Sequence, residues 1–276
     1  MERFVIVESI AELTTLRIDH VLGNGSNLLA PDHGISGTTV RLAGEFRAVE
    51  VVGGPPNGVV VRVGAGVPNA VLISRLSRLG LAGAGPLAGV PGTMGGAVAM
   101  NAGTALGEIS GVLVAVEGLI DGRIARIERS ALPMNYREGG LPAGFVVTHA
   151  ELALTSLGVA EEQERMAMHL TRRRATQPLD LPSCGSVFRN PLGDAAGRLI
   201  ESVGLKGHRV GGAQISERHA NFIVNLGDAT ALNVMHCIRA AWETVRNETG
   251  ICLQPEVHVL GDWPEILWPF PSAGVL

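Results

Sequence analysis

The chain of 276 residues is poor in lysine, tyrosine and charge of either sign. It contains a single lysine, Lys206, and a single tyrosine, Tyr136, and only 17% of its residues are charged. A formal net charge of −4 provides no basic surface for nucleic acid, so we expect no nucleic-acid partner. Low charge together with 46% hydrophobic residues argues against a disordered chain and allows a large core.

Cysteines and long apolar runs are also scarce. Cys184, Cys237 and Cys252 show no CxxC or Cys/His spacing, which argues against a disulfide scaffold and against a zinc site. We therefore expect no metal, and a reducing, cytoplasmic location. No apolar run is long enough to cross a bilayer, and acidic residues interrupt residues 1–16, so we expect neither a membrane span nor a signal peptide.

Hydrophobic periodicity predicts an α+β protein in which short strands and helices alternate with glycine-rich turns. Strands are predicted at residues 4–7, 20–22, 40–42, 48–52, 59–63, 112–119, 123–127, 144–149, 151–154 and 251–260. Helices are predicted at residues 9–16, 69–79, 161–176, 195–203 and 229–249, the last ended by Gly250. Residues 262–276 form a Trp/Pro-rich tail without periodicity.

Glycines are abundant, 37 in all, and they cluster in loops. One loop runs from Gly23 to Asn27, and a longer one covers residues 85–97 and leads into Asn101. Such loops free backbone N–H groups to bind phosphate, and the hydroxyls of Ser or Thr add donors. Neither loop has Rossmann or Walker spacing. The alternative is a set of tight turns, but two such loops early in one chain favour a pyrophosphate and hence a dinucleotide.

Three polar positions outside these loops are candidates for chemistry. Ser186 follows Gly185 in a run that ends in an Asn-Pro turn signal, which places its hydroxyl at the edge of an element; the alternative is a buried serine bonded to its own backbone. Arg137 offers a planar fork for a carboxylate or phosphate, or it is an ordinary surface arginine. Glu256 lies on the predicted last strand, where an exposed carboxylate is the simpler interpretation.

Taken in order, several segments resemble the UDP-N-acetylenolpyruvoylglucosamine reductase family, whose members reduce a UDP-sugar in peptidoglycan precursor synthesis. The resemblance covers residues 4–261. It rests on residues 23–29, 89–103, 136–137, 177–178, 182–191, 196–201, 204–207, 211–225 and 255–257. The short stretch from His149 to Gln177 resembles the shorter of the family's two structural types.

The resemblance implies an α+β architecture. An FAD-binding fold of the vanillyl-alcohol-oxidase type, made of two α+β subdomains, precedes a C-terminal α+β substrate-binding domain. The implied boundaries are residues 1–52 and 53–158 for the two FAD-binding subdomains and 159–250 for the substrate-binding domain. Residues 251–276 would hold the last strand, returning to the FAD site, and the tail. Family members usually begin with some tens more residues, so the first subdomain is expected to be truncated.

The resemblance also implies the reaction. NADPH reduces a non-covalently bound FAD, and hydride then passes to C3 of the enolpyruvyl group of the UDP-sugar. Ser186 would protonate C2, while Arg137 and Glu256 would stabilise the negative charge that develops on the carboxyl side. Such charge suits an arginine in a dry pocket, and Glu256 would have to be protonated or well paired to help there. We expect a monomer or weak oligomer.

The remaining implied roles concern binding. The FAD-binding residues would be Gly23, Asn24, Gly25, Ser26, Asn27, Leu28, Gly89, Pro91, Gly92, Thr93, Gly95, Gly96, Ala97 and Asn101. Tyr136, Asn190 and Lys206 would bind substrate, and the basic cluster Arg172–Arg174 is a further candidate for the diphosphate, although it also suits a helix C-terminus.

Two alternatives stay open at this point. The chain departs from the family at Thr104-Ala105-Leu106, where a tyrosine is common, and this alters the expected flavin or nicotinamide environment. The chain could therefore be a flavin reductase of the same fold that acts on another enoyl acid, or a binding protein that has lost flavin.

Overall fold

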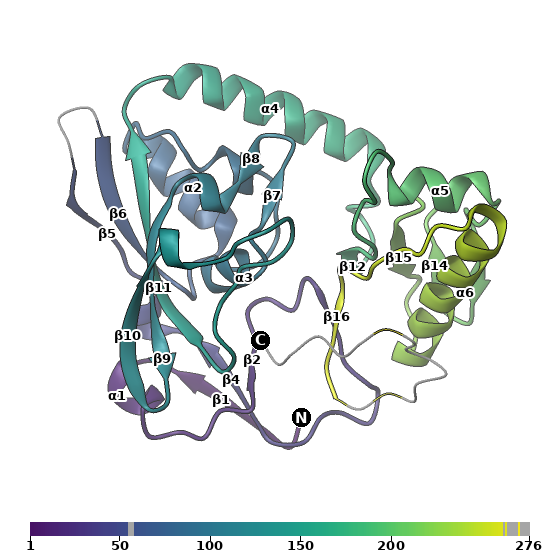
Figure 1. Ribbon diagram of the computed structural model, residues 1–276, viewed down its shortest axis with the longest axis horizontal. Helices are drawn as coiled ribbons and strands as arrows, with labels where there is room; N and C mark the ends of the chain where they lie inside the picture. Colours follow the sequence, from purple (N-terminus) through teal and green to yellow (C-terminus); the bar gives the residue numbers. More distant parts are fainter. Residues whose placement is uncertain (55–57, 262, 264–269, 271–276) are drawn as a thin grey trace.

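The chain forms two hydrophobic cores that follow one another along the sequence, as the computed structural model shows (Figure 1). The structure describes residues 1–54, 58–261, 263 and 270. The first core collects buried side chains between Val7 and Leu154, and the second those between Cys184 and Val257. Helix α4 (Val159–Thr176) crosses from the first part to the second. We call the residues before α4 the N-terminal part and those after it the C-terminal part.

The N-terminal part begins with a small parallel sheet in the order β1-β4-β2, which comprises β1 (Arg3–Val7), β4 (Thr38–Leu42) and β2 (His20–Val21). Helix α1 (Ile10–Leu13) is shorter than predicted, and Ser9 caps it by accepting a hydrogen bond from the Glu12 amide. Val7, Val40 and Leu42 turn toward the core, so the sheet supplies one wall of it.

A five-stranded antiparallel sheet forms the centre of this part, in the order β10-β9-β11-β6-β5. Its strands are β10 (Arg123–Glu128), β9 (Leu113–Ile120), β11 (Val146–Thr155), β6 (Gly58–Gly64) and β5 (Val49–Gly53). The prediction of two strands at residues 144–149 and 151–154 was wrong, because β11 runs unbroken through Ala150. It pairs with a strand on each side, and the polar Thr148 and His149 are as buried as their apolar neighbours, so polar residues do not mark the end of a strand here.

Short elements complete the N-terminal part. The helices are α2 (Asn69–Arg78) and α3 (Met94–Ala99), and the short strands are β3 (Leu28–Leu29), β7 (Gly103–Thr104) and β8 (Gly107–Glu108). Single 3₁₀ turns occupy Gly44–Arg47, Gly85–Leu87, Ile109–Gly111 and Arg129–Ala131.

The C-terminal part packs two helices on a four-stranded antiparallel sheet in the order β12-β15-β14-β13. The strands are β12 (Ser183–Ser186), β15 (Phe222–Asn225), β14 (Ala213–Ile215) and β13 (Arg209–Val210), and the helices are α5 (Ala196–Ser202) and α6 (Ala231–Thr249). Thr230 and Asn233 form a capping box at the start of α6, and Gly250 ends it in the left-handed conformation, as predicted.

The chain then returns to the N-terminal part, where β16 (His258–Val259) pairs in parallel with β3. The prediction of a strand over residues 251–260 was wrong for all but these two residues. Pro255 carries no amide hydrogen and makes only an isolated bridge with Phe188, so regular pairing starts after Glu256. Glu256 thus lies in the segment before the strand, with its amide bonded to the Val187 carbonyl.

The predicted domain limits fall differently on these elements. The limit between residues 52 and 53 lies inside β5, whereas the limits at 158/159 and 250/251 coincide with the start of α4 and the end of α6. The division into two FAD-binding subdomains and a substrate-binding domain stays a prediction. The tail predicted at residues 262–276 lies outside the described residues except for residues 263 and 270.

Candidate functional site

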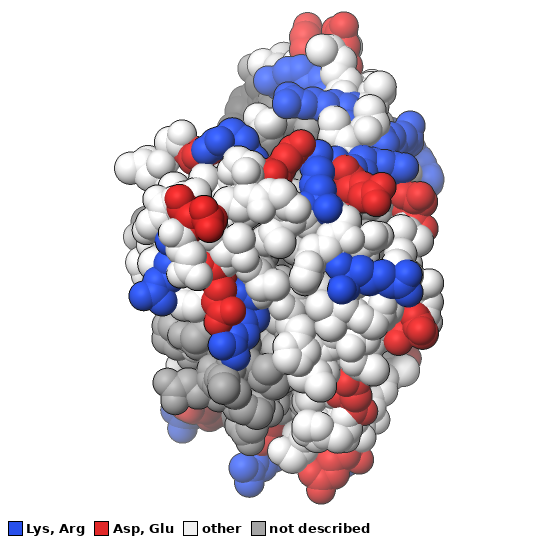
Figure 2. Space-filling view, turned by 90° about the vertical axis from the view of Figure 1, so that its right-hand side faces the viewer, with Lys and Arg blue, Asp and Glu red and all other residues white. Residues whose placement is uncertain are grey.

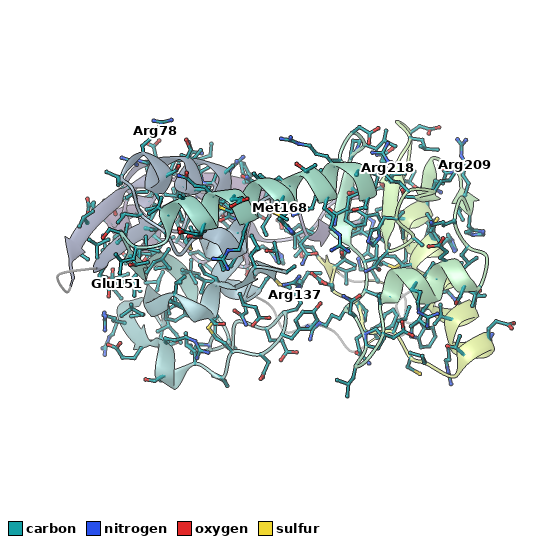
Figure 3. All side chains as sticks on the ribbon, turned by 90° about the horizontal axis from the view of Figure 1, so that it is seen from above. Arg78, Arg137, Glu151, Met168, Arg209 and Arg218 are labelled. Atoms are coloured by element: carbon teal, nitrogen blue, oxygen red, sulfur yellow. The ribbon has the colours of Figure 1, made fainter. Side chains whose placement is uncertain are left out.

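A cavity of about 1100 Å³ lies between the two parts and is walled by both. Among the residues that Figure 3 labels, Arg137 lies in the middle of the molecule, where the two parts meet. The walls come from the glycine loops, the turn at Tyr136–Arg137, one face of the end of α4, and the segments that carry Ser186 and Glu256. This volume is just above the range of about 300–1,000 Å³ that is typical of small-molecule sites, which often form between packed units.

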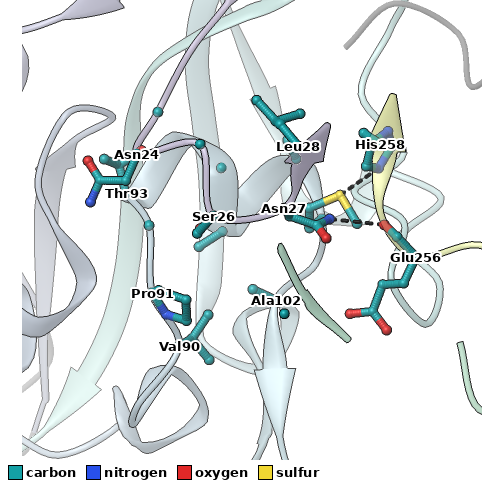
Figure 4. Close-up of a pocket in the computed structure, with 18 of the residues that line it drawn as sticks. Asn24, Ser26, Asn27, Leu28, Val90, Pro91, Thr93, Ala102, Glu256 and His258 are labelled. Atoms are coloured by element: carbon teal, nitrogen blue, oxygen red, sulfur yellow. Dashed lines mark hydrogen bonds between the residues drawn. The ribbon is translucent and has the colours of Figure 1, made fainter. Parts of the chain in front are cut away.

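The two predicted glycine loops face each other across one end of this cavity (Figure 4). A Cβ atom added to Gly23 would stand 2.9 Å from Thr93 Oγ1, and one added to Gly92 would stand 3.1 Å from Ser26 Oγ. The two loops therefore pack together at two places, where a glycine of either loop faces a hydroxyl group of the other. Larger residues at Gly23 or Gly92 would push the loops apart, and Gly92 also has a φ of +107°, which favours glycine.

The backbone amides of these loops are available to a ligand. In the described part of the chain, the amides of residues 23–27, Gly92 and Thr93 donate no hydrogen bond. Clustered free amides with nearby hydroxyls suit the phosphates of a dinucleotide. The loop residues thus fit the pyrophosphate of FAD, and all of the predicted FAD-binding residues line the cavity except Asn101.

The turn that carries Arg137 is tightly built. Asn135 and Glu138 exchange backbone hydrogen bonds of 3.0 and 2.9 Å, which leaves Tyr136 and Arg137 at the tip. Arg137 has a φ of +60°, an uncommon conformation for a residue with a side chain. Such strain persists only where surrounding contacts hold it, and it marks a position at which the side-chain direction matters.

Arg137 and Glu256 form an ion pair in the cavity wall although 119 positions separate them in sequence. Arg137 Nε donates to Glu256 Oε1 at 2.8 Å, and the two side chains are only 19% and 14% exposed. The Arg137 guanidinium also lies 5.0 Å from the centre of the Tyr136 ring. Burial raises the pKa of the Glu256 carboxyl, and the charges of Arg137 and Arg189 partly offset that rise.

Ser186 ends β12 with its hydroxyl unengaged. Within the described residues, Ser186 Oγ makes no hydrogen bond, so it does not bond its own backbone as the alternative interpretation required. Gly185 has a φ of +78° and brings this strand near the Ser26 carbonyl of the first glycine loop. The hydroxyl is thus in the cavity wall and able to donate a proton.

A buried asparagine fixes the backbone just after Ser186. The side chain of Asn221 accepts from the Phe188 amide at 2.9 Å and donates to the Phe188 carbonyl at 2.8 Å. The Val187 amide bonds the Asn221 carbonyl, and the Val187 carbonyl accepts from the Glu256 amide at 2.7 Å. Asn221 therefore fixes the backbone of Val187 and Phe188, and Val187 in turn bonds the Glu256 segment.

Two predicted binding residues lie outside the cavity. Asn101 is buried, and its side chain donates to the Asn135 carbonyl at 2.9 Å and to Glu108, so it supports the Arg137 turn and does not line the cavity. Lys206 is a partly exposed side chain that pairs with Glu201 at 2.7 Å. Asn190 does line the cavity, and its side-chain oxygen accepts from the Ala196 amide.

Two further residues of the cavity wall were not predicted individually from the sequence. One belongs to the predicted basic cluster Arg172–Arg174, and the other was not named at all. Of the basic cluster, Arg173 alone reaches the cavity, bonding the Gly89 carbonyl at 2.6 Å and Gln177 at 2.9 Å. His258 lies in the wall with Nε2 2.9 Å from Met100 Sδ (Figure 4), and burial lowers its pKa. The spacing of four residues between Arg173 and Gln177, the residue that follows α4, was a signal that could have marked Arg173.

Comparison with known proteins agrees with this geometry. Residues 177–260 match the family described as "UDP-N-acetylenolpyruvoylglucosamine reductase, C-terminal domain", and residues 11–118 match the one described as "FAD binding domain". A UDP-N-acetylenolpyruvoylglucosamine reductase of Anaeromyxobacter dehalogenans is 46% identical over 244 residues, which are 88% of this chain and 73% of the relative. One from Nitrosococcus oceani is also 46% identical, over 87% of this chain and 80% of the relative.

The chain belongs to the UDP-N-acetylenolpyruvoylglucosamine reductase family. A crystal structure of such a reductase from Thermus caldophilus matches with a TM-score of 0.83 and 40% identity, covering 95% of this chain and 92% of that one. The predicted α+β fold class is thereby confirmed, with an FAD-binding domain followed by a C-terminal α+β part. As a member of this family the chain is an oxidoreductase with FAD as cofactor and NADPH as reductant.

Proposed function

We propose that this chain reduces the enolpyruvyl group of UDP-N-acetylglucosamine enolpyruvate and so forms UDP-N-acetylmuramate for peptidoglycan. The observation that carries the proposal is the meeting of Ser186, Arg137 and Glu256 in the wall of one cavity whose other end is formed by the FAD-binding loops. These three residues come from segments far apart in the sequence. Their convergence places a proton donor and a carboxylate-binding arginine in the wall of the same cavity.

The roles follow from the chemistry of the substrate. FAD, when bound by the two glycine loops, supplies to C3 the hydride taken from NADPH. Ser186 donates a proton to C2, so hydride and proton together saturate the C=C bond. Arg137 binds the adjacent carboxylate, where negative charge grows during the addition, and its fixed position lets it meet that charge without rearranging.

Glu256 orients Arg137 through their ion pair, and it is either paired with Arg137 or protonated. A carboxylate beside growing negative charge would oppose the reaction unless it were neutral or paired. Burial raises the pKa of Glu256, which favours the proton, and the 2.8 Å bond to Arg137 supplies a partner when the proton is absent. Either state leaves the site without an unpaired anion.

The rest of the cavity binds the substrate. We assign Tyr136 and Asn190 to the UDP-sugar because both line the cavity near the catalytic residues, and we withdraw Lys206 because its ammonium lies outside. In the described residues no helix is both long and apolar enough to span a membrane. A cytoplasmic location and a monomeric or weakly associated state stay part of the proposal, and three free thiols fit a reducing compartment.

The decisive experiment separates the two half-reactions at the flavin absorption band. Purified holoenzyme is reduced with one equivalent of NADPH without oxygen and then mixed with UDP-N-acetylglucosamine enolpyruvate. Rapid return of the oxidised spectrum, with UDP-N-acetylmuramate identified by mass spectrometry, supports the proposal. Reoxidation by an enolpyruvyl acid without UDP, and not by the UDP-sugar, would identify the chain as a reductase for another enoyl acid.

A further inference from the structure

A second ion pair lies beside the pair of Arg137 and Glu256. Arg189 donates from one terminal nitrogen to Glu138 Oε1 at 2.7 Å. Glu138 directly follows Arg137 in the turn, and Arg189 belongs to the segment that bonds the Glu256 segment through its backbone, since the Arg189 amide donates to the Gln254 carbonyl at 2.8 Å.

The charges of the two pairs alternate. In the turn, the cation Arg137 is followed by the anion Glu138. The C-terminal part pairs them with the anion Glu256 and the cation Arg189, respectively. The four side chains are neutral together. Two consecutive residues of one turn are thus held by two segments that are themselves joined through backbone hydrogen bonds, which restricts both sliding and rotation of the turn.

We propose that Glu138 and Arg189 form a positioning pair that holds the Tyr136–Arg137 turn against the C-terminal part and so aims the Arg137 guanidinium at the substrate carboxylate. The remaining anchors of the turn lie within the N-terminal part, namely the bond of Asn101 to the Asn135 carbonyl and the bond of the Gly139 amide to the Ala99 carbonyl. Among the hydrogen bonds and ion pairs of the described residues, those of Arg137 with Glu256 and of Glu138 with Arg189 connect the turn to the part that carries Ser186.

The exposure of the pair argues for positioning and against a large effect on stability. The side chains of Arg189 and Glu138 are 26% and 51% exposed, and ion pairs as exposed as this add little to folding. Small displacements of a group that binds the reacting end of a substrate nevertheless slow catalysis strongly. The pair of Glu138 and Arg189 can thus affect the rate of the reaction without affecting the stability of the fold.

The chain offers a direct probe of the turn, because Tyr136 is its only tyrosine. Uniform incorporation of 3-fluorotyrosine gives one ¹⁹F resonance, which reports on the tip of the turn in the FAD-loaded enzyme without any substrate. We expect E138Q to shift or broaden this resonance and R189K to preserve it. The matched control is E243Q, which removes the carboxylate of the Arg239–Glu243 contact, also 2.7 Å long and 31% and 43% exposed, on α6.

Kinetics then tests the role in the reaction, which rests on the proposed function. E138Q and R189Q should slow reoxidation of the reduced flavin by UDP-N-acetylglucosamine enolpyruvate about tenfold and leave reduction by NADPH, flavin content and the thermal midpoint unchanged. The double variant E138Q/R189Q should be no slower than either single one, since both remove the same contact.

The outcomes are distinct. An unchanged Tyr136 resonance in E138Q would show that the pair does not position the turn. This conclusion would hold whichever substrate the enzyme reduces. A changed resonance with wild-type reoxidation would overturn the link to catalysis. A wild-type enzyme that the UDP-sugar does not reoxidise would instead refute the proposed function, and the resonance would still decide whether the pair holds the turn.

Discussion

Removing the Ser186 hydroxyl should block one half of the reaction and spare the other. Ser186→Ala deletes a group that makes no hydrogen bond to a described residue, so no buried partner is left unpaired. We expect the free energy of unfolding to change by less than about 0.5 kcal/mol. Loss of a positioned general acid slows its step by roughly 10²- to 10⁴-fold. At 1.36 kcal/mol for each factor of ten, that raises the barrier by about 2.7–5.4 kcal/mol.

Rapid mixing at the flavin band measures the two halves separately. NADPH should bleach Ser186→Ala at the wild-type rate, because that hydride transfer needs no proton at C2. The UDP-sugar should then restore the oxidised spectrum 10²- to 10⁴-fold more slowly than in the wild type. Ser186→Cys should keep part of the activity, since a thiol also donates a proton.

Ser183→Ala is the matched control. Ser183 lies in the same strand, and its hydroxyl accepts only a long bond of 3.4 Å from the Gly185 amide, so both half-reactions should keep their rates. The reasoning is refuted if Ser186→Ala slows flavin reduction and leaves reduction of the substrate intact, because the serine would then have a structural role.

Three further predictions concern the arginine, the cofactor loops and pH. Arg137→Ala should lower turnover by about 10²- to 10³-fold with FAD still bound, and a steady-state assay showing near-normal turnover would contradict its role. Gly92→Ala places a Cβ at a φ of +107° and 3.1 Å from Ser26 Oγ, so FAD should bind about tenfold more weakly in a fluorescence titration; unchanged affinity would count against contact of the loops. Burial lowers the pKa of His149 below 6.5, so the unfolded chain gains its proton first and stability should fall as pH drops from 7.5 through 6.5. His149→Gln should flatten that slope in urea unfolding, and an equal slope would exclude His149 as its source.

One face of the molecule shows no strong concentration of charge. On the face that Figure 2 presents, basic and acidic side chains are mixed, and neither sign gathers over a large area. This agrees with a small-molecule substrate bound in an internal cavity. The information about activity is concentrated where the two parts meet.

Local features could be read from the sequence because they depend on a few neighbouring residues. The glycine loops, the cap at Ser9 and the end of α6 at Gly250 follow from backbone preferences that glycine and serine express anywhere. The order of motifs around Ser186, Arg137 and Glu256 also indicated the family. The buried strand β11 was harder, since residues 146–150 are all buried and show no alternation that marks where a strand starts or stops.

Only the tertiary structure decided which of these residues work together. The bond between Arg137 and Glu256 spans 119 positions, and the bond between Glu138 and Arg189 spans 51. No local pattern shows that Asn101 supports the Arg137 turn, that Lys206 lies outside the cavity, or that Arg173 reaches it. Such contacts depend on how two separately packed cores meet. That arrangement results from many long-range contacts acting together, whereas a motif in the sequence records only the preferences of its own few residues.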